Sequence, residues 1–297
     1  MSRDLPVIAI TTGDPSGIGP EIASAALRDP RVAGVCQPRL YGPHAPDEIA
    51  GFPAGRVHAP SGRAAHDAIV AATRDALAGR VAAIVTAPIN KEAFAAAGLP
   101  WRGHTELLAD LCGVTDVAMM FWSEPLRVVL ASVHVPLRDV PSVLTFDRWL
   151  RTIRLTSTSL WRFGIERPRI AVAGVNPHAG EHGLLGSEEA DVVAPAIAQA
   201  AREGADVAGP FPADTVFVRA IRGEFDVVIA AYHDQGLIPI KVVAFGRAVN
   251  VTLGLPIIRT SVDHGTAFDI ARQGRANPES LIEAVLLAVR LAARRTH

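Results

Sequence analysis

The sequence has few cysteines, almost no net charge and no long apolar run, and each of these gaps excludes a class of protein. Two cysteines, Cys36 and Cys112, are too few and too far apart for a disulfide framework or a Cys-x-x-Cys metal site. A formal net charge of −1 provides no basic field for nucleic acid, so an anion site has to be local. No apolar run approaches the roughly 20 residues that span a bilayer, and the N-terminus lacks the apolar region of a signal peptide. We therefore expect a cytoplasmic protein with buried thiols and without nucleic-acid or membrane partners.

The sequence does contain a recurring order of apolar run, polar cluster and helical pattern. Buried strands are predicted at residues 7–12, 81–86 and 168–175, helices at 66–77 and 188–203, and an amphipathic helix at 149–163. This alternation is typical of α/β proteins, and 297 residues allow one long unit or two lobes. Open α/β sheets bind ligands beyond the carboxyl ends of their strands.

The C-terminal third, residues 227–278, carries the densest set of such polar clusters. An apolar run ending in Ala231 and Tyr232 leads into His233 and Asp234, and residues 256–258 lead into Arg259. Strands that end in charged side chains place charge at the edge of a sheet. We therefore expect the ligand site to involve this segment.

A glycine-rich turn, GDPSGIGPE (13–21), joins the first predicted strand to a helix. Its prolines and its glycine spacing exclude the dinucleotide-binding GxGxxG pattern. Two interpretations stay open at this stage. The turn either offers backbone N–H groups and a helix N-terminus to an anion, or it is only a tight turn.

Three of the ten histidines share one setting. His134, His178 and His233 each follow an apolar run, and a doubly wound sheet would bring the ends of those runs to one edge. Three neutral imidazoles that converge can hold a divalent transition metal and leave positions open for a ligand. Glu181 and Asp234 are candidate acceptors for the second ring nitrogens. The alternative is that each histidine is an ordinary hydrogen-bonded loop residue.

A second set of polar side chains is suited to anions. Arginine and lysine bind phosphate and carboxylate groups, and a His-Thr pair at a helix start is assisted by the helix dipole. The alternatives are structural salt bridges for the two basic residues and a helix cap for the threonine. The candidates are His104, Thr105, Lys241, Asn250 and Arg259.

Several motifs together resemble the 4-hydroxythreonine-4-phosphate dehydrogenase family of vitamin B6 biosynthesis. They occur in the family's order over nearly the whole chain: GDPSGIGPE (13–21), TAPINKEA (86–93), GHTE (103–106), HVPLRDV (134–140), NPHAGE (176–181), GPFPADT (209–215), YHDQGLIPIK (232–241) and VNVTLGLPIIRTSVDHGTAFDIA (249–271). Residues 261–278 are also similar to the adenine-side loop of isopropylmalate and isocitrate dehydrogenases.

The resemblance implies an isocitrate/isopropylmalate-dehydrogenase-like α/β fold, with two α/β/α lobes and a cleft between them. Residues 1–98 and 242–297 would form the nucleotide-side lobe, and 99–241 the central lobe with the metal site and the dimer contacts. The family's homodimer shares each metal site between its subunits. The stretch at 41–66 is shorter than usual in the family, which bears on substrate identity more than on reaction type.

The resemblance also implies residue roles. His134, His178 and His233 would hold one divalent metal, zinc, cobalt, manganese or magnesium, and the three imidazoles favour a transition ion. His233 and Lys241 would take part in catalysis. His104, Thr105, Lys241, Asn250 and Arg259 would contact substrate. Gly13, Asp14 and His264 would lie near a bound NAD or NADP.

The implied reaction is an oxidative decarboxylation of 4-phosphohydroxy-L-threonine to 3-amino-2-oxopropyl phosphate. Metal lowers the pKa of the C3 hydroxyl, hydride passes to NAD(P)+, and the β-keto acid loses CO2. Two alternatives with the same chemistry are 4-phospho-D-threonate and dihydrodiol dicarboxylates. From other classes, a metal-dependent hydrolase and a non-catalytic anion-binding protein stay open; the first predicts turnover without nucleotide, and the second predicts binding without turnover.

Overall fold

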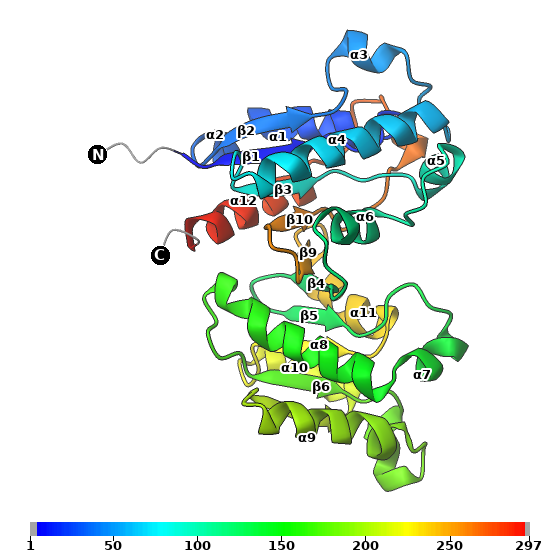
Figure 1. The fold of residues 1–297 in the computed structure, drawn as a ribbon, viewed down its shortest axis with the longest axis vertical. Helices are drawn as coiled ribbons and strands as arrows, with labels where there is room; N and C mark the ends of the chain where they lie inside the picture. The colour runs from blue at the N-terminus through cyan, green and yellow to red at the C-terminus, as the bar shows by residue number, and fades with distance from the viewer. Residues whose placement is uncertain (1–4, 295–297) are drawn as a thin grey trace. The chain divides into compact units, whose positions relative to one another are not determined.

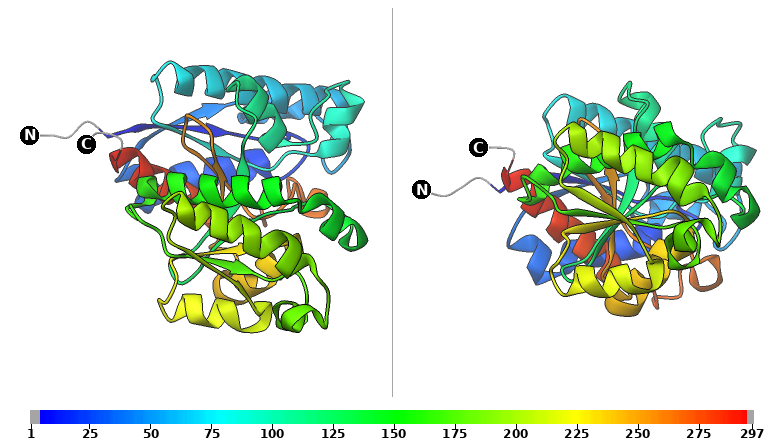
Figure 2. Two further views of the ribbon diagram at one scale, coloured as in Figure 1. Left: turned by 60° about the horizontal axis from the view of Figure 1, so that its bottom comes forward. Right: turned by 90° about the horizontal axis from the view of Figure 1, so that it is seen from below.

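The computed structural model describes residues 5–294 and divides the chain into two compact units. The first unit joins the two chain ends, Met1–Thr115 and Leu255–His297, and the second is the middle of the chain, Asp116–Gly254. Each unit consists of a sheet with helices on its two faces, as the α/β pattern of the sequence predicted (Figures 1 and 2). No helix within the described range is both long and apolar enough to cross a membrane.

The first unit contains four parallel strands in the order β2 (Gln37–Tyr41), β1 (Val7–Thr11), β3 (Ala83–Thr86) and β10 (Arg259–Ser261). Helix α4 (Ala59–Leu77) covers one face, and α1 (Gly19–Arg28) and α12 (Glu279–Ala293) cover the other (Figure 2). Alanines recur on the buried side of α4 at three- and four-residue intervals, and these small side chains bring the helix close to the sheet. The unit's shorter helices are α2 (Pro30–Ala33), α3 (Pro46–Ala50), α5 (Lys91–Ala96) and α6 (His104–Leu111).

The second unit has the strand order β9 (Val249–Leu253), β4 (Ala118–Trp122), β5 (Arg127–Leu130), β8 (Val227–Ala230), β6 (Ile170–Ala173) and β7 (Val207–Phe211). Strand β4 runs antiparallel to both of its neighbours, and the remaining pairs are parallel. Two helices pack on each face: α8 (Phe146–Ser159) and α9 (Ala194–Arg202) on one, α10 (Ala213–Ile221) and α11 (His233–Ala244) on the other (Figure 2). A short helix α7 (Val140–Val143) follows β5.

Three features of the structure differ from the sequence-based expectations. The apolar run at 256–258 was expected to be a strand ending before Arg259, but β10 begins at Arg259. The two prolines of the motif at 209–215 predict a rigid loop that leads into a helix, but the first three residues of the motif complete β7. Residues 233–244 form a helix despite Pro239 in its interior. The long-range pairing of β7 with β6 and of β10 with β3 is not visible in local patterns.

The division into units also falls later in the chain than we expected. The sequence suggested lobes of 1–98 with 242–297 and of 99–241. In the structure α6 packs against α4, which keeps residues up to Thr115 with the first unit. Strand β9 pairs with β4, which keeps residues up to Gly254 with the second.

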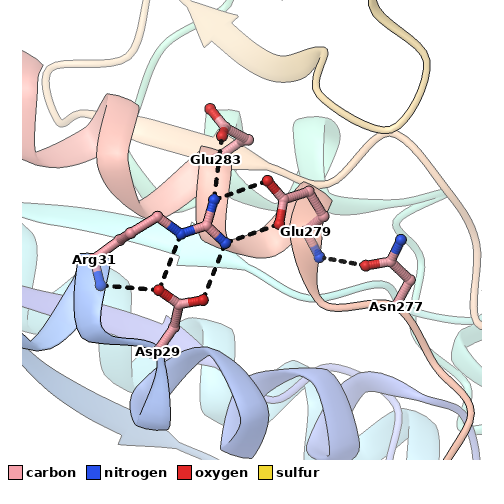
Figure 3. A network of polar contacts seen from close by, with 5 residues as sticks. All are labelled: Asp29, Arg31, Asn277, Glu279 and Glu283. Atoms are coloured by element: carbon pink, nitrogen blue, oxygen red, sulfur yellow. Dashed lines mark hydrogen bonds and ion pairs between the residues drawn. The ribbon is translucent and has the colours of Figure 1, made fainter.

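A surface network joins the two chain ends within the first unit (Figure 3). Arg31 of α2 donates to Glu279 of α12 at 2.9 and 2.8 Å and to Asp29 at 3.0 Å. Glu283 lies 4.0 Å from the same guanidinium, and Asn277 accepts the Glu279 N–H. The bonds to Glu279 hold α12 against α2, and the side-chain and backbone hydrogen bonds from Arg31 lower the pKa of Asp29.

Candidate functional site

The three candidate metal ligands leave the same edge of the second unit's sheet. Strands β5, β8 and β6 are adjacent and parallel, and the loop or helix after each one carries a histidine. His134 follows β5 by a loop, His178 follows β6, and His233 is the first residue of α11 after β8. The histidine pattern predicted strands whose carboxyl ends meet at one edge of a sheet, and β5, β8 and β6 are arranged in this way.

Two of these histidines lie together. The ring centroids of His134 and His233 are 5.9 Å apart, and both line a pocket of about 480 Å³ with Pro136, Leu137 and Tyr232. His233 Nδ1 is 2.6 Å from Asp234 Oδ1, so this ring can donate to a carboxylate and turn Nε2 toward the pocket. Paired imidazoles with an oriented tautomer and an open cavity fit a divalent transition ion.

The third histidine is not grouped with them in one chain. Among residues 5–294 no three His, Cys, Asp or Glu side chains are arranged to hold a metal ion. His178 is exposed and begins a run of six residues with positive φ, from +44° to +94°, which ends at Gly183. Four of the six are not glycine, and each of these four costs roughly 1–2 kcal/mol in this left-handed region. Such strain persists where surrounding contacts enforce it, and it is frequent at functional sites.

In the first unit, a buried arginine lies beside a histidine. Arg259, 2% exposed, donates from Nε and Nη2 to Thr86 Oγ1 at 3.2 and 2.7 Å. Thr86 donates in turn to Ser261, so its lone pairs are available to the guanidinium. His104 opens α6, and its Nε2 is buried without a hydrogen-bond partner.

Burial favours the neutral form of both side chains and therefore lowers their pKa. It lowers the pKa of Arg259 to about 9, so the guanidinium is still charged at pH 7. Burial, with the nearby charge of Arg259 as a smaller cause, holds the pKa of His104 well below 6.5. At neutral pH the pair thus offers one cation and one neutral imidazole whose Nε2–H tautomer can donate to an anion.

The other candidate substrate contacts lie in different elements. Thr105 follows His104 in α6. Lys241 lies in α11 with Nζ 5.7 Å from the centre of the Phe245 ring. Asn250 lies on β9 opposite Phe121, and its Oδ1 is buried without a partner. His104, Thr105 and Arg259 thus belong to the first unit, and Lys241 and Asn250 to the second.

The candidate cofactor residues come from two segments that lie side by side. Ile18 donates its N–H to Thr266, and Glu21 accepts from the Ala276 N–H, so the turn at 13–21 packs on the loop at 263–276. Both segments line a pocket of about 340 Å³ beside α1. His264 Nε2 is buried without a partner in this loop.

The glycine-rich turn directs its N–H groups into the protein. Asp14 donates to Pro88, Ser16 to the Asp14 carboxylate at 2.8 Å, and Gly17 to the Asp14 carbonyl. Gly13 has a φ of +69°, and its Cα lies so close to the Pro88 carbonyl that no side chain fits. These contacts favour the tight-turn interpretation over an anion cradle.

Asp14 itself is fully buried in the turn. Burial raises its pKa to about 6, and the Ser16 N–H and the nearby His58 offset only part of that effect. Its second oxygen has no hydrogen-bond partner. The fold therefore holds a carboxylate at this position at a cost to stability.

Thr86 and Glu189 were missed by the sequence reasoning. Thr86 belongs to a quoted motif, but nothing local indicates that it would accept two hydrogen bonds from Arg259. Glu189 is buried beneath the segment that carries His178. The signal for it was weak, since an acidic pair at a helix start is common on surfaces.

The fold defines the class to which the protein belongs. An isocitrate dehydrogenase from Methylococcus capsulatus is 17% identical, with a TM-score of 0.51 over 98% of this chain and 88% of that one. The fold is thus of the isocitrate-dehydrogenase-like α/β type that residues 261–278 predicted.

The chain belongs to the family described as pyridoxal phosphate biosynthetic protein PdxA, whose sequence profile matches residues 26–288. A 4-hydroxythreonine-4-phosphate dehydrogenase from Desulforapulum autotrophicum is 46% identical over 97% of this chain and 96% of its own length. A protein from Bradyrhizobium diazoefficiens, provisionally named D-threonate 4-phosphate dehydrogenase, is 47% identical, and the match covers 96% of each chain.

Solved structures agree with this assignment. The 4-hydroxythreonine-4-phosphate dehydrogenase of Klebsiella pneumoniae is 42% identical, with a TM-score of 0.87 over 97% of this chain and 99% of that one. A terephthalate 1,2-cis-dihydrodiol dehydrogenase from Burkholderia xenovorans is 31% identical, with a TM-score of 0.67 over 96% and 98% of the two chains. The protein is therefore an oxidoreductase of the dehydrogenase type, and this type implies a nicotinamide cofactor.

Proposed function

We propose that the protein oxidises 4-phosphohydroxy-L-threonine with NAD+ or NADP+ and a divalent metal. The C3 alcohol becomes a ketone, its hydride reduces the nicotinamide, and its hydroxyl proton is released. The β-keto carboxylate then loses CO2, and the resulting enolate takes up a proton to give 3-amino-2-oxopropyl phosphate. The observation that carries the choice of a phosphorylated substrate is the buried Arg259 beside the unpartnered Nε2 of His104.

Arg259 and His104 would bind the anionic end of the substrate. A buried guanidinium attracts phosphate strongly because water screens it little, and its planar donors suit phosphate oxygens. Neutral His104 adds a donor without adding a second positive charge next to Arg259. Thr86 fixes the guanidinium from the side of the sheet, and Thr105 extends the set of donors at the start of α6.

The pocket of His134 and His233 would hold the metal. A divalent ion there supplies Lewis-acid polarisation of the alcohol oxygen and of the ketone that follows. Asp234 orients His233 by its contact with Nδ1. Lys241 is the candidate donor of the proton that the enolate takes up after loss of CO2. The buried Oδ1 of Asn250, which has no hydrogen-bond partner, is a candidate acceptor for a substrate N–H or O–H group.

The same proposal includes a homodimer that completes the metal site. Helix α11 starts at His233 and, with Phe245 just past its last residue, exposes an apolar stripe: Ile238 is 62% exposed, Val242 79% and Phe245 79%. Apolar stripes of this kind mark protein contacts more often than free surface. A second copy that covers this stripe would lie next to His233, where it would contribute the third imidazole that the described residues of one chain do not group with His134 and His233. His178 is the proposed third ligand.

Two other substrates remain candidates because relatives point to them. The Bradyrhizobium relative favours 4-phospho-D-threonate, which shares the phosphate and the secondary alcohol. The terephthalate dihydrodiol dehydrogenase favours a dihydrodiol dicarboxylate, at lower identity. We rank them second and third.

A substrate panel tests the proposal. Protein loaded with Co2+ is incubated with each of the three substrates and with each nucleotide, and the absorbance of reduced nicotinamide is followed. We expect 4-phosphohydroxy-L-threonine to give the highest kcat/KM. Unphosphorylated 4-hydroxy-L-threonine is the matched control, and it should be at least about 100-fold poorer because Arg259 would lose its partner. Equal turnover with and without the phosphate would contradict the role of Arg259 and His104.

A further inference from the structure

The left-handed segment that carries His178 is anchored at its base by one buried carboxylate. Glu189 is 4% exposed and opens the π-helical turn Glu189–Val193 that precedes α9. Its Oε1 accepts the backbone N–H groups of Val175 and Asn176, both at 2.7 Å. Its Oε2 accepts from the side-chain amide of Asn176 at 3.0 Å. Three donors therefore converge on this carboxylate immediately before His178.

The carboxylate also contacts the inside of the turn. Gly180 has a φ of +80°, and a Cβ at this position would lie 2.8 Å from Glu189 Oε2. A Cβ at Gly174 would lie 3.1 Å from Oε1. The segment thus packs against the Glu189 carboxylate from the end of β6 to the middle of the left-handed run. A side chain at either glycine would displace this carboxylate.

We propose that Glu189 is a positioning residue for His178, and this inference rests on the proposed metal site. Left-handed backbone at four non-glycine residues does not persist without compensating contacts. Glu189 provides such contacts in the dry base of the loop, where hydrogen bonds to a charged acceptor are strong. It acts through the backbone at 175–176 and fixes the direction in which the exposed imidazole of His178 leaves the fold.

Glu188 offers a control within the same structure. Its Oε2 accepts from the same Asn176 side chain, at 2.7 Å. Within the described part of the chain Glu188 accepts no backbone N–H of this segment. Glu188 therefore contacts only the side chain of Asn176 in this segment, whereas Glu189 also holds the backbone. Substituting each of them in turn separates the two roles.

The test is Co2+ binding, measured by the visible absorption of the bound ion and by competition with a chelator. The variants are Glu189→Gln, Glu188→Gln and His178→Ala, each compared with the full-length wild-type protein. Glutamine keeps the size of Glu189 but removes the negative charge from the oxygen that accepts the two backbone N–H groups, and it places an amide donor against the side-chain amide of Asn176, which loosens the segment. Because loss of a group that orients a ligand typically costs 10- to 100-fold in metal affinity, we expect about this loss for E189Q and little change for E188Q.

Two further readouts separate positioning from general stability. The melting temperature of metal-free E189Q should stay close to that of E188Q, and the affinity for NADH should be unchanged. Gly180→Ala perturbs the segment from its other side and should weaken Co2+ binding in the same direction. If E189Q does not fold, the Co2+ affinity of Gly180→Ala tests the positioning role in its place.

The outcomes are distinct. Wild-type Co2+ affinity in both E189Q and G180A would overturn the positioning role, while the metal site itself would stand. Equal losses in E188Q and E189Q would overturn it as well, because contact with Asn176 alone would then explain the effect. If H178A binds Co2+ as tightly as wild type does, the proposed metal ligand is wrong and the inference falls with it.

Discussion

Replacing Asp14 with asparagine should stabilise the protein at neutral pH. The carboxyl of Asp14 is fully buried, and its pKa is raised from 3.8 to about 6. The folded state therefore binds this proton more tightly than the unfolded chain does. Between about pH 4 and pH 6 the folded state carries more protons, so stability falls as the pH rises through this window. Above pH 6 the charged carboxylate costs about 3 kcal/mol relative to its protonated form.

In the wild-type protein the Ser16 N–H donates to Asp14 Oδ1. Asparagine removes the charge and keeps an oxygen that can accept this hydrogen bond. Its amide N–H groups would lack acceptors, which offsets about 1–2 kcal/mol of the gain. We therefore expect Asp14→Asn to raise the free energy of unfolding by about 1–2 kcal/mol at pH 7.5. The fall in stability between pH 4 and pH 6 should also become shallower.

Urea unfolding at several pH values from 4.5 to 7.5 measures both effects. Asp47→Asn is the matched control, because Asp47 is an exposed aspartate of the same unit. A D14N protein that is less stable than wild type at pH 7.5, with an unchanged pH profile, would refute the reasoning. If Asp14 also serves the cofactor, the stabilised variant should bind NADH more weakly, as is common where a functional site is strained.

Two other predictions concern the anion cluster and the exposed helix face. Arg259→Lys should raise KM for the phosphorylated substrate about 10- to 100-fold and change kcat less, because lysine keeps the charge but loses the planar donors; Arg74→Lys, at an exposed position of α4, should have no effect in the same steady-state assay. Paired Val242→Glu and Phe245→Glu should convert a dimer to monomers in analytical ultracentrifugation, because two carboxylates would be buried against the partner. Val218→Glu, on an exposed position of α10, is the control, and a dimer that survives the paired substitution would place the interface elsewhere.

The parts of the fold that could be predicted are those with a local signal. Strand β1 and helix α12 show continuous or periodic apolar residues, and the hairpin of β4 and β5 shows two runs with a short turn between them. Helix α11 lacked such a signal because Pro239 opposes a helix interior. Its Leu237 and Ile240 are nevertheless buried, and packing on β5 and β8 outweighs the local preference.

The candidate site was predictable in its residue types and less so in its geometry. The three histidines were found because each follows an apolar strand, and parallel neighbours bring such ends to one edge. The sequence did not indicate that His178 would sit in a left-handed run, since only Gly180 and Gly183 in that run favour such a conformation. It also did not indicate which two of the three histidines lie together within the described part of one chain, because loop direction depends on buried contacts such as those of Glu189.

The central claim is that oxidation requires a metal held by histidines from these loops. The most direct measurement is the formation of reduced nicotinamide in a single turnover, with metal-free protein before and after one equivalent of Co2+ per chain. Our account predicts no signal before addition, full signal after it, and no rescue of His134→Ala or His233→Ala by the same Co2+. Undiminished turnover in rigorously metal-free protein, or in those variants, would contradict it.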